Sequence, residues 1–140
     1  MTHCLDLARL AKANGKTAVG SVIVRDGKII SEGIEGSPDF PPILAHAEAI
    51  AIVKAIEVSG TRDLSDCSLY TTVEPCLMCS FLIRETQINR VIYGTGAGSI
   101  GGATSNYPIL IVTDITRWKS VPEVTSGILS TECDQMLIKK

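Results

Sequence analysis

The amino-acid sequence predicts an α/β fold in which helices cover both faces of a sheet. Two β-rich runs near the N-terminus flank Asp26-Gly27, a pair that is a strong signal for a β-hairpin. After this hairpin, segments with apolar residues at helical spacing alternate with short β-rich runs. Because helices that alternate with strands pack onto a sheet from both sides, this order predicts a layered α/β structure.

Each element of this fold has its own signal in the chain. We expect helices at residues 5–13, 45–58, 76–85 and 130–140, and strands at 18–24, 28–33, 68–73, 90–93 and 124–129. Asn-Gly and Ser-Gly pairs end the first two helices, and Pro75 suits the first turn of the third. Ser130 or Thr131 is expected to cap the last helix, because a hydroxyl oxygen there accepts hydrogen bonds from free backbone N–H groups.

The remaining segments are predicted loops. Residues 35–42 are rich in Gly, Ser and Pro, and residues 94–102 hold five glycines in nine positions. A loop with so many glycines must turn sharply or approach another part of the chain closely. Residues 106–120 fit a helix and a strand equally well.

Length, composition and charge narrow the class of protein. A chain of 140 residues with 45% hydrophobic and 20% charged residues predicts one globular domain spanning residues 1–140. The formal charge of −2 argues against a general nucleic-acid binder but allows a local basic patch. The sequence has no secretory signal and no membrane-spanning stretch, and its five cysteines are an odd number for a disulfide framework. We therefore expect a cytoplasmic protein without a membrane partner.

Two short motifs carry the chemistry. His46 and Glu48 flank an alanine, and Cys76 and Cys79 follow Pro75 in a Pro-Cys-x-x-Cys pattern. One histidine and two cysteines supply three zinc ligands, which leaves the fourth position of a tetrahedral zinc open to water. A glutamate beside such a water is able to move protons, as hydrolysis requires. The two motifs together predict a catalytic zinc site.

The spacing of these residues sets a geometric condition. Cys76 and Cys79 are three apart near a helix start, where the helix dipole and free N–H groups favour thiolates. His46 and Glu48 are two apart, so they point roughly 200° apart around a helix axis. They converge only if both lie at the very start of their helix. The prediction is therefore that two helix N-termini meet at one zinc ion.

Simpler interpretations exist for several of these residues. Cys-x-x-Cys alone is equally typical of a redox pair or of half a structural zinc site, although a structural site would need a fourth ligand. Glu74 is expected to orient the Pro-Cys turn without being catalytic. Trp118 and Tyr107 line a pocket or simply pack. The remaining cysteines of the chain are expected in the core: Cys4, Cys67 and Cys133.

His-Ala-Glu followed by Pro-Cys-x-x-Cys resembles the zinc-dependent cytidine deaminase superfamily. Residues 18–24, 69–76 and 88–94 are similar to the branch that contains tRNA adenosine, guanine and cytosine deaminases, and the resemblance runs from about residue 7 to residue 137. It implies a three-layer α/β/α sandwich with a mixed five-stranded sheet. It also implies a homo-oligomer, often a dimer.

The resemblance assigns roles to the motif residues. His46, Cys76 and Cys79 would bind one zinc ion per chain, and Glu48 would shuttle protons while ammonia leaves an amino-bearing ring carbon. We also expect the substrate to contact a set of residues around this centre: Glu35, Ala47, Pro75 and Tyr107.

Glu35 departs from the pattern of these relatives. A substrate-contacting asparagine usually stands eleven residues before the zinc histidine, and Glu35 occupies that position here. A carboxylate only accepts hydrogen bonds, whereas an amide also donates them. One hypothesis is that the substrate presents N–H donors to Glu35, as guanine would; the alternative is that Glu35 points to solvent.

The sequence favours a hydrolytic deaminase of a small nucleobase-like ring or nucleoside, such as guanine, cytosine or another amino-substituted heterocycle. A tRNA wobble-adenosine deaminase is the first alternative. It is disfavoured because the last helix offers only Lys139 and Lys140 as cations, beside Glu132 and Asp134, although a dimer could assemble further cations. Those are Arg62, Arg84, Arg90 and Arg117. The second alternative is a non-catalytic, zinc-stabilised binding module.

Overall fold

The computed structural model describes residues 1–138 and is built around a mixed five-stranded sheet with the strand order β2-β1-β3-β4-β5. The strands are β1 (Gly20–Arg25), β2 (Lys28–Ile34), β3 (Cys67–Val73), β4 (Arg90–Thr95) and β5 (Glu123–Thr125). β1 pairs antiparallel with both β2 and β3, whereas β3, β4 and β5 run parallel. The predicted fold class is confirmed.

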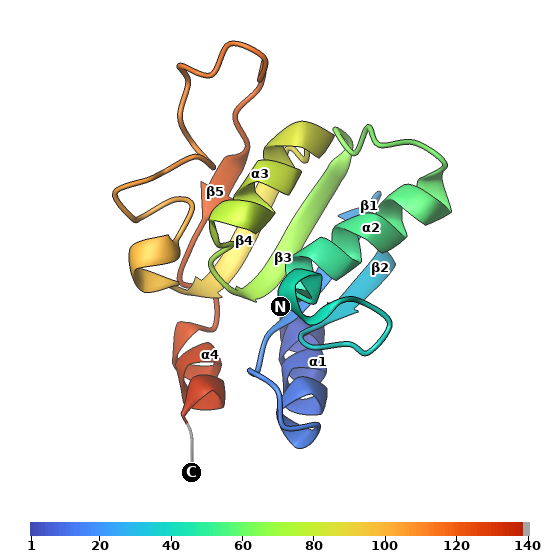
Figure 1. The fold of residues 1–140 in the computed structure, drawn as a ribbon, viewed down its shortest axis with the longest axis vertical. Coiled ribbons are helices and arrows are strands. Elements are labelled where there is room, and N and C mark those ends of the chain that lie inside the picture. Colours follow the sequence, from blue (N-terminus) through green and yellow to red (C-terminus); the bar gives the residue numbers. More distant parts are fainter. Residues whose placement is uncertain (139–140) are drawn as a thin grey trace.

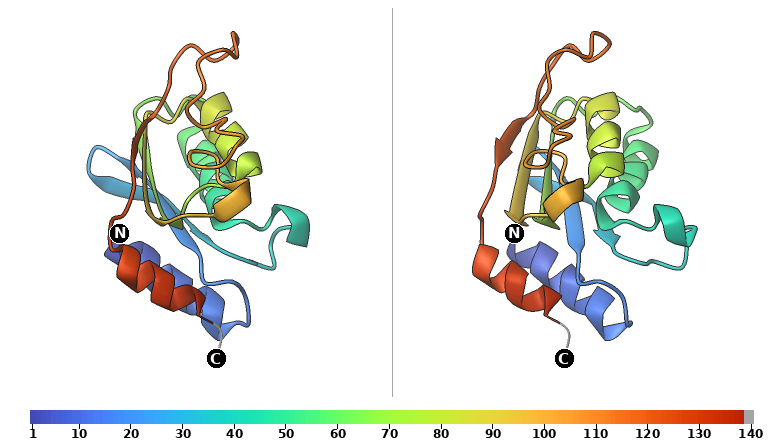
Figure 2. Two further views of the ribbon diagram at one scale, coloured as in Figure 1. Left: turned by 90° about the vertical axis from the view of Figure 1, so that its left-hand side faces the viewer. Right: turned by 60° about the vertical axis from the view of Figure 1, so that its left-hand side comes forward.

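Helices cover both faces of the sheet (Figure 1). The α-helices of residues 1–138 are α1 (Thr2–Ala13), α2 (Ala47–Ser59), α3 (Leu77–Thr86) and α4 (Ser130–Leu137). α2 and α3 lie side by side on one face, and α1 and α4 lie side by side on the other (Figure 2). Short 3₁₀ turns, η1 (Pro42–Leu44) and η2 (Gly98–Ile100), lie in the loops that follow β2 and β4.

The hairpin and the packing of α2 follow directly from the sequence. Asp26 and Gly27 join β1 to β2 with φ angles of 51° and 75°, the left-handed conformation that a two-residue hairpin turn requires. Gly33 in β2 lies against the first turn of α2, where a Cβ atom would collide with the Ala47 carbonyl. The missing side chain therefore lets the start of α2 approach the sheet closely.

The apolar core lies between the sheet and the layer formed by α2 and α3. Its fully buried side chains come from all these elements and include Ile23, Ile52, Leu69, Ile83 and Val91. Cys4, Cys67 and Cys133 are also buried, as predicted. Within residues 1–138, no helix combines the length and apolar character needed to cross a membrane.

The C-terminal third differs most from the prediction. β5 ends at Thr125 rather than at residue 129, because the chain turns away at Gly127 and Leu129, both with positive φ. Residues 106–120 form turns instead of a helix or a strand. The prediction of a Ser130 or Thr131 cap was wrong: α4 begins at Ser130 itself, and Leu129 holds the cap position without a side-chain hydrogen bond. Lys139 and Lys140 lie outside the described residues.

Candidate zinc-dependent active site

The two motifs lie at the starts of neighbouring helices. His46 is the residue before the first turn of α2, and Cys76 is the residue before the first turn of α3. Both have extended backbone angles, so their side chains project past the helix ends instead of around the helix surfaces. Glu48 and Cys79 follow within the first turns. The predicted meeting of two helix N-termini is therefore present in the fold.

The three predicted ligands converge. The ligand atoms of His46, Cys76 and Cys79 all lie within 4.8 Å of one another, and His46 Nδ1 is 3.5 Å from Cys76 Sγ. Tetrahedral zinc, bonded to sulfur at about 2.3 Å and to nitrogen at about 2.0–2.1 Å, requires about 3.6 Å between such a nitrogen and sulfur. Cys79 is fully buried, whereas His46 and Cys76 are half-buried. The donor set therefore fits one zinc ion that can be reached from one side.

The pKa values of the two cysteines favour one thiolate at the metal site. A hydrogen bond from the Cys79 thiol lowers the pKa of the Cys76 thiol to about 5, with help from the backbone N–H groups of Cys79 and Met78. The pKa of Cys79 is raised, first by that same hydrogen bond and then by burial. Without metal, the pair thus shares one proton. Zinc binding would release it, because only thiolates bind zinc.

Glu48 is a buried carboxyl beside this cluster. Its side chain is 4% exposed, Oε1 accepts a 3.1 Å hydrogen bond from the Thr71 hydroxyl, and Oε2 lies 3.8 Å from the Cys79 sulfur. Ser21 in turn donates to Thr71 at 2.8 Å and fixes that hydroxyl. Burial raises the pKa of Glu48 to about 8. The metal-free site therefore holds a protonated carboxyl at neutral pH, with Oε1 oriented by the Thr71 hydroxyl.

Glu35 lies at the start of α2. Its Oε2 accepts a 2.8 Å hydrogen bond from the Ala47 backbone N–H, so the carboxylate caps the helix that carries Glu48. Glu35 is half-buried, and burial raises its pKa. The alternative that Glu35 points to solvent is wrong. Its contact with a substrate stays a prediction, and so does that of Ala47, whose N–H is engaged with Glu35.

Glu74 is a second buried carboxyl, and it organises the loop that follows β4. It accepts hydrogen bonds of 2.8–3.1 Å from the backbone N–H groups of Ala97, Ala103 and Thr104 and from the Thr104 hydroxyl. Glu74 was predicted to orient the Pro-Cys turn through hydrogen bonds, and it does so through the loop rather than by direct contact. The Gly102 N–H donates to the Pro75 carbonyl at 2.8 Å. Glu74 therefore holds the loop, and the loop holds the turn.

Close contacts with Glu74 and Ser80 explain why the loop of residues 94–102 is rich in glycine. A Cβ atom on Gly101 would collide with the Glu74 carboxylate, and one on Gly102 would collide with the Ser80 side chain. The predicted close approach is thus confirmed. The acceptor role of Glu74 was not evident from the sequence, because its donors come from residues more than twenty positions away.

Other predicted residues lie farther from the ligands or are engaged elsewhere. Tyr107 is on the surface with 64% of its side chain exposed, and its substrate contact stays a prediction. Pro75 is buried within the turn. A cavity of about 720 Å³ borders Glu35 and is also lined by Lys16 and Phe40, from the loops after α1 and β2. None of its lining residues is a predicted zinc ligand.

The fold and the ligand cluster together define a zinc-dependent hydrolytic deaminase. Residues 1–95 match the family of the cytidine and deoxycytidylate deaminase zinc-binding region, and the chain belongs to that family. The predicted resemblance and the predicted single zinc ion are confirmed.

Several relatives cover nearly the whole chain. A tRNA-specific adenosine deaminase of Streptococcus pyogenes is 36% identical over 137 residues, 98% of this chain and 84% of that protein. A tRNA-specific adenosine deaminase of Aquifex aeolicus is 35% identical over 127 residues, which are 88% of this chain and 84% of that protein.

Solved structures give a similar result. One from a study of A-to-I editing by tRNA:A34 deaminases has a TM-score of 0.87 at 30% identity and covers 98% of this chain and all of that chain. Guanine deaminase from Bacillus subtilis has a TM-score of 0.63 at 38% identity, over 68% of this chain and 61% of that one. The chain is thus similar to deaminases that differ in substrate.

Proposed function

We propose that this protein deaminates adenosine to inosine in tRNA, with release of ammonia. The observation that carries the proposal is the similarity to tRNA-specific adenosine deaminases over 98% of the chain, together with the TM-score of 0.87 to a tRNA:A34 deaminase structure. This substrate differs from the small nucleobase favoured by sequence reasoning, and it implies a cytoplasmic enzyme.

The residues around the cluster suit this reaction. His46, Cys76 and Cys79 would hold zinc, which when bound supplies an activated water at neutral pH. Glu48 is the residue placed to move protons: Oε2 faces the cluster, while Thr71 holds Oε1 in position. In this proposal Oε2 takes a proton from the attacking water and delivers it to the ring nitrogen. It then passes the remaining hydroxyl proton to the amine, which leaves as ammonia. Burial of Glu48 keeps bulk water from competing for that proton.

The cavity beside Glu35 supports a substrate larger than a base. It offers the aromatic ring of Phe40 and the ammonium of Lys16 next to the start of α2. Single-stranded RNA is typically bound by stacking of bases on aromatic rings and by cations near the backbone. We propose that nucleotides flanking the target adenosine occupy this cavity.

A small aminated ring such as guanine is the second candidate. Two observations favour it. Glu35 presents a carboxylate at the position where the resemblance leads us to expect an amide. The similarity to a guanine deaminase also favours this candidate.

A single experiment separates the candidates. Zinc-loaded protein is assayed for ammonia release from a tRNA anticodon stem-loop with a wobble adenosine, and from guanine, cytosine, adenine and their nucleosides. The proposal predicts turnover of the stem-loop, with a KM that rises steeply with salt. Turnover of guanine with no reaction of the stem-loop would establish the second candidate instead.

Controls test whether the activity belongs to this site. Glu48→Ala should abolish turnover of whichever substrate reacts, and Phe40→Ala should impair the stem-loop while sparing guanine. A protein that holds one zinc per chain but turns over no substrate would support the non-catalytic binding module.

We also propose that the protein is a homodimer. Apolar side chains on α2, α3 and adjacent loops are exposed in the single chain: Ile43, Val53, Phe81, Ile100 and Tyr107. Exposed apolar side chains on the layer of α2 and α3 support a subunit interface there. Light scattering should give twice the chain mass, and Phe81→Glu should give the monomer mass.

A further inference from the structure

A second hollow lies at the far end of α3 from the zinc ligands. It has a volume of about 410 Å³ and lies between the end of α3, the loop after α2 and the segment that leads into β5. Arg84 on its wall is eight residues after Cys76, roughly 12 Å along the helix axis. The hollow is therefore separate from the active site.

Arg84 is the unusual residue of this hollow. Its side chain is 3% exposed, and Nη1 donates at 2.9–3.2 Å to three carbonyl groups of the 106–120 segment. Those carbonyls belong to Ile109, Leu110 and Val112. Nε and Nη2, however, have no acceptor among the described residues. These two atoms form one edge of the guanidinium, and their parallel N–H bonds match two oxygens of a single anion.

Trp118 adds a third unused donor. Its ring lies against the Arg84 guanidinium, with the Arg84 Cζ atom 4.7 Å from the ring centroid, and it borders the same hollow. Its Nε1 is buried and has no acceptor within residues 1–138. Buried N–H donors in proteins are nearly always satisfied, and unsatisfied ones point to an unseen partner. Here the partner must be an acceptor.

The charges around the hollow indicate that the acceptor is an anion. Its wall carries the cations Arg62, Arg84, Arg117 and Lys119 against the carboxylates of Asp63 and Glu85, which leaves an excess of two positive charges. The whole chain, by contrast, has a formal charge of −2. A local excess of this size favours an anionic ligand such as a phosphate group.

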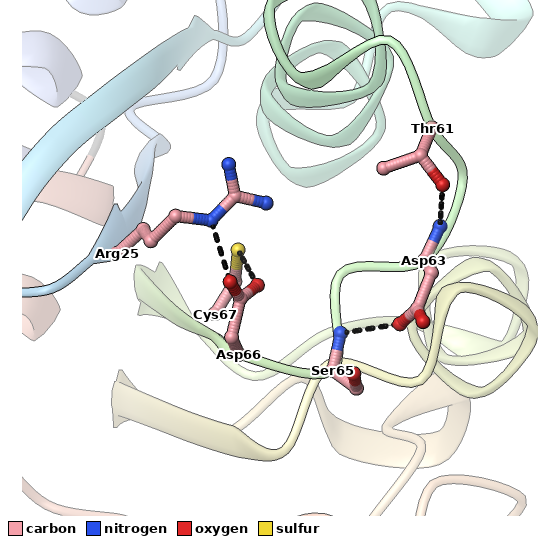
Figure 3. Close-up of polar contacts among 6 residues, drawn as sticks. All are labelled: Arg25, Thr61, Asp63, Ser65, Asp66 and Cys67. Atoms are coloured by element: carbon pink, nitrogen blue, oxygen red, sulfur yellow. Dashed lines mark hydrogen bonds and ion pairs between the residues drawn. The ribbon is translucent and has the colours of Figure 1, made fainter.

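The rim of the hollow combines a fixed backbone with two exposed arginine side chains. Arg62 and Arg117 both pair with Glu85, at 3.7 Å and 2.7 Å, yet their side chains are 70% and 65% exposed and able to turn toward a ligand. The loop that carries Arg62 is fixed by short local hydrogen bonds: the Asp63 N–H donates to Thr61, and the Ser65 N–H donates to Asp63 (Figure 3).

We propose that this hollow binds a phosphate group, either of a free anion or of an RNA backbone. Two phosphate oxygens accept from the Nε–Nη2 edge of Arg84, and Arg62 and Arg117 neutralise the remaining charge. The site stands independently of the reaction at the zinc centre. Because the Nε–Nη2 edge is buried, a neighbouring side chain such as Trp118 must shift for the anion to reach it.

Trp118 is the only tryptophan of the chain, so its fluorescence reports directly on this site. The zinc-loaded 140-residue chain in phosphate-free buffer is titrated with inorganic pyrophosphate, with inorganic phosphate, and with triuridine RNA that lacks terminal phosphates. Sodium chloride at equal ionic strength is the reference. The proposal predicts a saturable change with at least one of the three ligands and none with chloride.

Variants locate the binding. Arg62→Gln combined with Arg117→Gln should weaken binding by about tenfold or more, because two charge-assisted contacts are lost. Arg84→Lys keeps the charge but removes the parallel donors, and it should weaken binding similarly. Arg9→Gln is the matched control, because Arg9 is an exposed arginine paired with Asp6 on α1. It should leave binding unchanged.

The outcomes decide the proposal. Tighter binding of pyrophosphate or phosphate than of triuridine assigns the site to a free anion, and the reverse order assigns it to an RNA backbone. No saturable change with any ligand, or equal binding by the Arg62→Gln/Arg117→Gln variant, overturns the proposal. The circular dichroism spectrum of each variant verifies its fold.

Discussion

Glu48 and Glu74 are both shielded from solvent, at 4% and 1% exposed, but the protein surrounds them very differently. Glu74 accepts from three backbone N–H groups and a hydroxyl, and these donors outweigh burial and lower its pKa. Glu48 accepts from the Thr71 hydroxyl, its Oε2 lies 3.8 Å from the Cys79 sulfur, and burial raises its pKa to about 8. Depth of burial and the number of donors together decide which carboxyl stays charged.

This difference separates two roles. A carboxylate that is saturated with donors is a fixed anchor, because protonating it would leave several N–H groups without an acceptor. A carboxyl with few donors gains and loses a proton at moderate cost, as a proton carrier must. The comparison therefore assigns Glu74 to holding the loop and Glu48 to chemistry.

The largest effect is expected from Glu48→Gln. The amide cannot carry the proton, so turnover should fall by at least about a thousandfold, within the range measured for general acid–base residues. Folding and zinc content should be unchanged, because the amide keeps the contact with Thr71. Ammonia release and metal analysis on the same sample test both points. Activity within tenfold of the wild type would contradict the role of Glu48.

The second prediction concerns pH and the metal-free protein. The folded pKa of Glu48, about 8, lies above its unfolded value of 4.5, so the folded state binds the proton more tightly. Its stabilisation is complete below pH 4.5 and is lost as the pH rises to about 8, by an amount on the order of 3–5 kcal/mol. Urea unfolding of chelator-treated protein at pH 5 and pH 8 measures this loss.

Glu48→Gln is the reference for that measurement, since it lacks the titrating group. The variant should lose less stability than the wild type over the same pH interval. Equal pH dependence in both proteins would assign the effect to other groups. Adding zinc should shrink the difference, because a divalent cation favours the ionised carboxylate.

The third prediction tests the anchor. Glu74→Gln replaces an oxygen by an amide group that donates, which leaves buried N–H groups without acceptors. The free energy of unfolding should fall by about 2–3 kcal/mol, the size typical of hydrogen bonds to a charged group. Glu123→Gln is a matched control, because Glu123 is 70% exposed and pairs with Arg90 at 3.9 Å. That change should cost less than about 0.5 kcal/mol.

The smallest effect is expected at Glu35, whose carboxylate accepts one hydrogen bond from a backbone N–H group, that of Ala47. Glu35→Gln keeps an oxygen for the Ala47 N–H, so stability should change by no more than about 1 kcal/mol. If Glu35 contacts the substrate, the ratio of kcat/KM for the stem-loop to that for guanine should rise by about tenfold, because an amide both donates and accepts. An unchanged ratio would remove Glu35 from the substrate contacts.

The sequence by itself determined the class of this protein and its zinc ligands. His46, Cys76 and Cys79 were identified because metal chemistry needs certain side chains at certain spacings, and both motifs lie at helix starts that local signals mark. The hairpin at Asp26-Gly27 and the alternation of strands and helices were readable for the same reason. Each depends on residues close together in the chain.

Only the tertiary structure decided the surroundings of those residues. The donors that distinguish Glu74 from Glu48, and the hydrogen bond that ties Glu35 to Ala47, join segments twelve or more residues apart. The turns of residues 106–120 likewise depend on a buried guanidinium from α3, so no local pattern indicated them. Long-range partners set pKa values, loop conformations and unused donors, because these depend on which groups the folded chain brings together in space.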